Sequence, residues 1–248
     1  MVTSEEILKF MQTSAYRPLT LEELIEHFGL EDSVERIREF TAIIREMEQK
    51  GQIILTRKKR YGLPEHMNLI VGRIQRNPKG FAFLIPDNPL KRDVYLKSED
   101  LNGAMHNDRV VVRLRKHLDP DKKQEGEVIR ILERANTRVV GTFESSRYFG
   151  FVIPDDSRLG TDFFIGKDDF NGAQDGMKVV IEVTKWPEKR RSPEGRVIEV
   201  LGQKGDPGVD VVSIVRKYQL PEAFPREVLD YAEKIPFTIP QEEMARRR

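Results

Sequence analysis

One aromatic segment of this sequence occurs twice, and the repeat constrains the fold more than any other feature. The string KGFAFLIPD at 79–87 returns as YFGFVIPD at 148–155. The match extends further at a shift of 69, which pairs Gly72 with Gly141, Asp93 with Asp162, Gly103 with Gly172 and Gly126 with Gly195. Between Pro86 and Pro154 the shift is 68, so the copies differ by one small gap. The chain therefore contains a duplicated unit of about 65 residues.

Each copy consists of short β-branched and aromatic runs that are interrupted by Pro, Gly, Asn and Asp. This spacing is typical of an all-β sandwich or barrel. Five strands in so short a unit are most economically closed into a barrel, because closure removes the unpaired edges. Two copies of this length are too few and too large for a solenoid. We therefore predict two five-stranded barrels, over residues 67–136 and 137–204.

The first 66 residues follow a helical pattern. Ser4 is the expected N-cap of a helix over about 5–12. Thr20, with Glu23 as its capping-box partner, begins a second helix, and Ser33 caps a third that Gly51 ends. The segment QIILTRKKRYGL then predicts a strand, a basic turn and a second strand. Three helices followed by a hairpin indicate a winged helix-turn-helix, which makes the whole chain an α+β multidomain protein.

The basic turn of this hairpin is a candidate nucleic-acid wing. It contains Arg57, Lys58, Lys59 and Arg60. Residues 1–66 nevertheless carry 12 acidic against 10 basic side chains, and several glutamates lie on the third helix. The alternative interpretation is a helical domain that contacts a protein or folds over the rest of the chain, with the four cations solvated. Both interpretations stay open.

Aromatic residues of the first copy are expected on one face of the barrel. Phe81 and Phe83 share a face, since side chains alternate along a strand, and Tyr95 lies between two aliphatic neighbours. A single aromatic in a small barrel usually belongs to the core, but the recurrence of the pattern favours outward rings. Outward rings would form a platform on which unstacked bases bind. The phosphate-directed charges would come from Arg73, Arg76, Lys79 and Lys97, in a segment with 14 basic and 10 acidic residues.

The strings KGFAF and DVYL resemble the two nucleic-acid-binding strand motifs of cold-shock domains, which are OB-fold barrels. The resemblance implies that Phe81, Phe83 and Tyr95 stack on single-stranded bases. The second copy retains Phe149, Phe151 and Phe164, but it lacks the lysine before the glycine, and Gly166 replaces Lys97. We therefore expect weaker RNA contact in the second copy.

A winged helix followed by two cold-shock domains resembles the amino-terminal half of bacterial ribonuclease R, a processive 3′-to-5′ exoribonuclease of the RNB family. Residues 205–248 look like the segment that joins the second barrel to the catalytic domain of that family. The resemblance implies a part that binds single-stranded RNA and admits it to the enzyme. The aspartate-rich stretch that holds Mg²⁺ in the full-length family is missing, and so is the S1 domain. We expect a truncated chain that is inactive alone and holds no cofactor itself.

Other classes of function find little support. The chain has no cysteine, and its four histidines are scattered without ligand-like spacing. It has neither an apolar run of membrane-spanning length nor a secretory signal, so we expect a cytoplasmic protein without membrane contact. The expected partner is single-stranded RNA, with structured RNA or a protein at the winged helix. The alternative is a stand-alone nucleic-acid-binding regulator or RNA chaperone.

Overall fold

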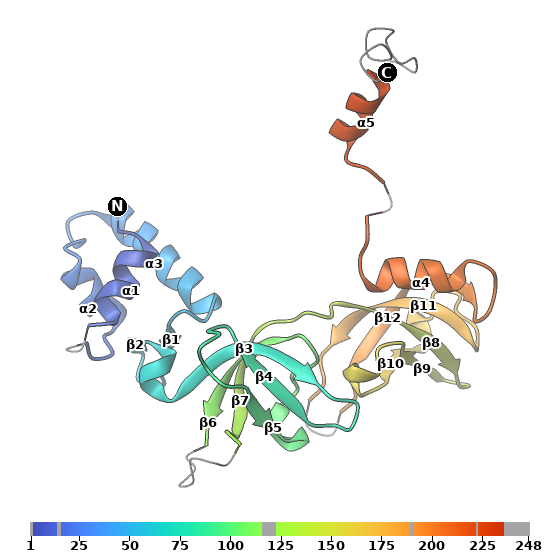
Figure 1. Ribbon diagram of the computed structural model, residues 1–248, viewed down its shortest axis with the longest axis horizontal. Helices are drawn as coiled ribbons and strands as arrows, with labels where there is room; N and C mark the ends of the chain where they lie inside the picture. The colour runs from blue at the N-terminus through green and yellow to red at the C-terminus, as the bar shows by residue number, and fades with distance from the viewer. Residues whose placement is uncertain (1, 14–15, 116–122, 189–190, 222, 236–248) are drawn as a thin grey trace, which may run out of the picture.

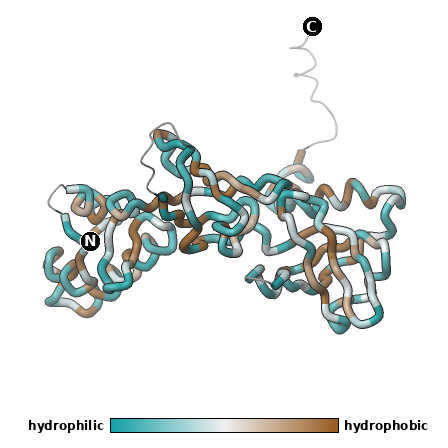
Figure 2. Tube along the Cα trace, turned by 90° about the horizontal axis from the view of Figure 1, so that it is seen from below, coloured by the Kyte–Doolittle hydropathy of each residue, from teal (hydrophilic) through white to brown (hydrophobic). Residues whose placement is uncertain are grey.

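The computed structural model describes residues 2–13, 16–115, 123–188, 191–221 and 223–235. Figure 1 shows a helical part, two β-rich parts and two further helices that follow one another along the chain. Figure 2 shows hydrophobic segments, in brown, in the helical part and in both β-rich parts. The order of helices and barrels is the one that the sequence predicts.

The helical part contains α1 (Ser4–Met11), α2 (Leu21–His27), α3 (Val34–Gln49) and the hairpin strands β1 (Ile54–Leu55) and β2 (Tyr61–Gly62). The cap of α1 is Thr3 and not Ser4, because Thr3 forms a capping box with Glu6. Thr20 and Ser33 cap α2 and α3 as predicted. The three helices and the hairpin are present, whereas the winged helix as a fold stays a prediction.

The first β-rich part is a five-stranded antiparallel sheet with the order β5-β4-β3-β6-β7. Its strands are β3 (Leu69–Arg76), β4 (Ala82–Pro86), β5 (Val94–Leu96), β6 (Arg109–Leu114) and β7 (Gly126–Glu133). The edges of the sheet meet through the parallel bridge between Tyr95 and Glu125, so the described strands do not close a continuous barrel. With only three residues, β5 offers little backbone for a longer pairing.

The second β-rich part is a closed barrel with the order β10-β12-β11-β8-β9. Its strands are β8 (Arg138–Ser145), β9 (Phe149–Pro154), β10 (Phe163–Gly166), β11 (Met177–Lys185) and β12 (Glu194–Gln203). Closure comes from the parallel pairs Phe164–Glu194 and Ile165–Gly195. Phe164 and Glu194 are the counterparts of Tyr95 and Glu125 at the repeat shift of 69, so both copies use the same closing contact.

The matched glycines at the start of each repeat, Gly72 and Gly141, are required by the same close approach of a neighbouring strand. A Cβ on Gly72 would lie 2.2 Å from the carbonyl oxygen of Ile85, and one on Gly141 would lie 2.3 Å from that of Ile153. These approaches are far inside van der Waals contact, and the obstructing atoms belong to the neighbouring strand's backbone. Each barrel therefore requires a residue without a side chain at this position.

The two β-rich parts share buried contacts that the sequence did not indicate. Met105, from the segment before β6, is completely buried among core residues of the second barrel such as Phe143 and Phe163. The buried carboxylate of Asp108 accepts hydrogen bonds from Arg134 Nη1 at 2.9 Å and from the Met105 backbone N–H at 2.8 Å. The Arg134 guanidinium in turn lies 4.3 Å from the centre of the Trp186 ring. The two repeats therefore pack as one unit.

Two helices follow the second barrel. The first, α4 (Val209–Lys217), lies in the predicted joining segment and packs on the second barrel: Val209 is buried, and Arg216 forms an ion pair with Glu199 at 2.7 Å. The following α5 (Arg226–Glu233) has no buried residue and projects away from the barrel in Figure 1. Short 3₁₀ helices lie at Pro64–Met67, Ser98–Leu101, Ser157–Leu159 and Lys167–Asp169. Within the described residues, no helix combines the length and apolar character that a membrane span requires.

Candidate nucleic-acid interface

The first aromatic cluster, Phe81, Phe83 and Tyr95, lies on the outer face of β4 and β5. Phe83 and Tyr95 are directly paired across these strands. All three ring centroids are mutually 5.7–5.8 Å apart, and each ring is partly exposed. The alternating residues Ala82, Leu84, Val94 and Leu96 are completely buried in the core. The outward direction of the predicted rings is therefore a consequence of strand alternation.

The second aromatic cluster, Phe149, Phe151 and Phe164, repeats this geometry on β9 and β10. Phe151 pairs with Phe164 across the strands, and the three centroids are 5.6–5.9 Å apart. The ring planes of Phe149 and Phe164 are inclined by 32°, close to the 37° between Phe81 and Tyr95. The two clusters are therefore geometric copies, and neither belongs to a barrel core.

The loop before each cluster is where the copies differ. Between the last paired residues of β3–β4 lie positions 77–81, and between those of β8–β9 lie positions 146–149, which is the one-residue gap of the repeat. In the shorter loop Tyr148 is 67% exposed, and the Arg147 guanidinium lies 5.4 Å from the centre of its ring. Neither residue was predicted from the sequence. Alignment of the strands at the shift of 68 places Arg147 at the position of Lys79 and Tyr148 at that of Gly80.

The third strand beside each cluster carries a different charge in the two copies. Gln75 of β3 is paired with Phe83, whereas Glu144 of β8 is paired with Phe151. Both side chains are exposed on the cluster face. A carboxylate at this position repels a phosphate backbone, while an amide is neutral. The second cluster is therefore less suited to a polyanion in this respect, although Arg147 adds a cation nearby.

Four cations were predicted around the first cluster, and the structure places them in different surroundings. Lys79 is exposed in the tight turn that leads to Phe81. Lys97 lies 3.5 Å from a Glu125 carboxylate oxygen, and Arg73 lies 3.4 Å from a carboxylate oxygen of Glu133. These ion pairs are partly solvated, so their strength is modest. Lys97 directly follows β5, whereas Arg73 also donates to the Asn107 carbonyl oxygen at 3.2 Å and so reaches toward β6 and β7, away from the cluster strands.

Arg76 does not join the cluster. Its Nη1 donates a hydrogen bond of 2.7 Å to the carbonyl oxygen of Leu159 in the second barrel, and its backbone N–H donates to His106 Nδ1 at 3.2 Å. Burial of the guanidinium lowers the pKa of Arg76. Among the four predicted cations, the structure therefore assigns Arg76 to the contact between the two barrels.

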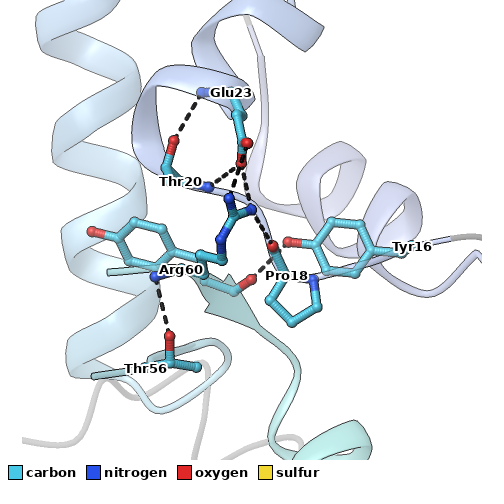
Figure 3. Close-up of polar contacts among 7 residues, drawn as sticks. Tyr16, Pro18, Thr20, Glu23, Thr56 and Arg60 are labelled. Carbon is cyan, nitrogen blue, oxygen red and sulfur yellow. Dashed lines mark hydrogen bonds and ion pairs between the residues drawn. The ribbon is translucent and has the colours of Figure 1, made fainter. Parts of the chain in front are cut away.

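The four cations of the predicted wing also lie in different surroundings. Arg60 donates hydrogen bonds to both carboxylate oxygens of Glu23, at 2.8 and 3.2 Å, and to the carbonyl oxygen of Pro18 at 3.0 Å (Figure 3). The Tyr16 hydroxyl donates to the carbonyl oxygen of Tyr61 beside this network. Arg60 thus ties the hairpin to α2. Arg57, Lys58 and Lys59 are exposed in the turn.

No group of three or more His, Cys, Asp or Glu side chains within the described residues is arranged to hold a metal ion. The adjacent aspartates Asp155 and Asp156 of the second barrel have other partners. Asp155 forms an ion pair with Lys178, and the Asp156 carboxylate forms one with the Arg158 guanidinium at 2.7 Å. Hydrogen bonds from Arg158 lower the pKa of Asp156 to about 2. The described residues therefore do not fit the Mg²⁺ site that the resemblance implies for the full-length family.

Two family models match the β-rich parts. A model described as "Ribonuclease B OB domain" matches residues 72–131, and one described as "Cold shock domain" matches residues 151–225. The second match extends through α4, in agreement with the packing of that helix on the barrel.

Curated relatives match the whole chain. Ribonuclease R of Thermotoga maritima is 33% identical over 100% of this chain, that of Acidithiobacillus ferrooxidans 34% over 100%, and that of Escherichia coli 32% over 99%. The chain is homologous to part of ribonuclease R. It spans 34%, 56% and 30% of the lengths of these three relatives.

Solved structures show the same fold. The apo form of Mycoplasma genitalium RNase R has a TM-score of 0.60 at 20% identity, over 68% of this chain and 27% of that one. Yeast Ssd1, a pseudonuclease, has a TM-score of 0.52 at 20% identity, over 71% of this chain and 26% of that one. At 20% identity these two likenesses show the shared fold alone.

Proposed function

We propose that this chain is the part of a ribonuclease R-like 3′-to-5′ exoribonuclease that binds single-stranded RNA and admits it to the enzyme. The observation that carries the proposal is the duplicated cluster of three outward rings. Aromatic side chains on the face of an OB barrel stack with bases whatever the base identity. Rings held 5.6–5.9 Å apart provide several such surfaces side by side.

The comparisons support RNA as the ligand. The solved Mycoplasma genitalium RNase R is described in complex with ribose methylated single-stranded RNA, at a TM-score of 0.60 to this chain. Both matched family models are OB or cold-shock domains. By analogy with that protein, the two clusters described above bind RNA in this proposal. Processive degradation, and the Mg²⁺ that it uses, are not assigned in this proposal to the residues that the structure describes.

The proposal is tested by filter binding of labelled oligo(A) to the 248-residue chain. We expect micromolar affinity that falls steeply with salt, because phosphate contacts release counterions. Phe83→Ala removes one of the three rings of the first cluster, and a stack of about 1–3 kcal/mol predicts a loss of about fivefold to more than a hundredfold. Phe151→Ala is the matched change in the second cluster, where we expect the smaller loss.

Tyr231→Ala is the control, since this ring is 70% exposed on α5 and lies in neither cluster. It should leave binding unchanged, and circular dichroism should show that all variants are folded. The proposal fails if the parent chain does not retain oligo(A) at low salt, or if Phe83→Ala, Phe151→Ala and Tyr231→Ala bind equally well.

A further inference from the structure

A cavity of about 290 Å³ lies away from the aromatic clusters, where the linker between the barrels, the first residues of β8 and the C-terminal end of α4 meet. Its wall includes three cations, one carboxylate and one aromatic ring: Arg138, Arg158, Lys217, Asp156 and Tyr218. The volume is close to the lower limit for small-ligand sites, about 300 Å³. The cavity can therefore hold a ligand of about the size of one nucleotide.

The charge of the wall favours an anion. Three cations and one carboxylate leave a formal charge of +2. Asp156 is ionised at neutral pH, because hydrogen bonds from Arg158, and to a smaller extent the charge of Lys217, keep its pKa at about 2. It therefore cancels only one of the cations. Arg138 is exposed, and Lys217 is half-buried at the end of α4.

Tyr218 adds a planar surface to this charge. It is 61% exposed, and the Lys217 ammonium group lies 5.6 Å from the centre of its ring. Asn107, Asn136 and Gln219 also line the cavity, and the Asn136 amide nitrogen already donates a hydrogen bond to the His106 carbonyl oxygen. The buried residues Val139 and Val140 line it as well. Cations beside an exposed ring and amides form a set that can bind a phosphate, stack on a base and recognise its edge.

We infer that this cavity binds a nucleotide, with the phosphate near Lys217 and Arg138 and the base against Tyr218. The choice of ligand rests on the proposed RNA binding. The site itself is separate, because Arg138 begins β8 whereas Glu144, beside the second cluster, is six residues further along. At about 3.3 Å per residue this separation is about 20 Å, which a mononucleotide cannot bridge.

The test titrates the 248-residue chain with uridine 5′-monophosphate, uridine and inorganic phosphate, followed by NMR chemical shifts. We expect the monophosphate to bind more tightly than uridine or phosphate. Lys217→Ala and Tyr218→Ala should each weaken it by at least about fivefold. Lys204→Ala, an exposed lysine outside the cavity wall, should not change it. The Phe83→Ala variant should bind the monophosphate normally, which separates this site from the aromatic clusters.

A second arm distinguishes RNA from a free nucleotide. Crosslinking of a 4-thiouridine oligonucleotide to a Tyr218-containing peptide supports an RNA nucleotide in the cavity, and monophosphate binding without this crosslink supports a free nucleotide. The inference is overturned if neither ligand is affected by Lys217→Ala and Tyr218→Ala. Failure of the parent chain to retain oligo(A), with intact monophosphate binding, would instead contradict only the proposed function.

Discussion

Met105 should stabilise the second barrel although it lies in the first repeat. Its side chain is completely buried in the core of the second barrel, and its backbone N–H is fixed by Asp108 at 2.8 Å. Met105→Ala loses a transfer free energy of about 1.5–3 kcal/mol and leaves a cavity that this fixed backbone cannot easily fill. We expect a loss of about 3 kcal/mol in the free energy of unfolding.

The assay is urea unfolding followed by fluorescence of Trp186, the single tryptophan, which packs against the second core. With a slope of about 1–1.5 kcal/mol/M, Met105→Ala should lower the midpoint by about 2–3 M. Met105→Leu keeps the volume and should cost less than about 1.5 kcal/mol. Leu84→Ala leaves a cavity in the first core instead. Far-UV circular dichroism should then change at a lower urea concentration than Trp186 fluorescence does. A Met105→Ala midpoint within about 0.5 M of the parent's would refute the shared packing.

The remaining predictions concern Arg60 and His106. Arg60→Ala should lower the thermal unfolding midpoint of the helical part, measured by circular dichroism, because Glu23 and the Pro18 carbonyl lose a donor. Lys58→Ala is the matched control. Equal midpoints for the two variants would contradict the structural role of Arg60. Burial, and then the charge of Arg158, lower the pKa of His106 below the usual histidine value of about 6.5. The folded state thus binds fewer protons than the unfolded state, so stability should fall as pH drops below about 6.5. His106→Gln should remove that dependence, and an unchanged pH profile would argue against it.

The sequence predicted those parts of the fold that depend on neighbours along the chain. Alternation in β5 was sufficient to send Tyr95 outward and Val94 and Leu96 inward, because the period of a strand is two. The caps at Thr20 and Ser33 followed from local hydrogen bonding within four residues. The repeat revealed two related β-units before any contact was known. These features require no knowledge of distant segments.

Tertiary structure alone decided which charged and apolar side chains are committed to packing. The acceptor of Arg76 Nη1 is 83 residues away, and the carboxylate that binds Arg60 is 37 residues away. Met105 fills a core built almost entirely from the second repeat. A cation or a methionine has the same local pattern whether it faces solvent or a distant carbonyl. Its role depends on which surfaces come into contact when the barrels pack. The order of residues along one strand does not specify these contacts.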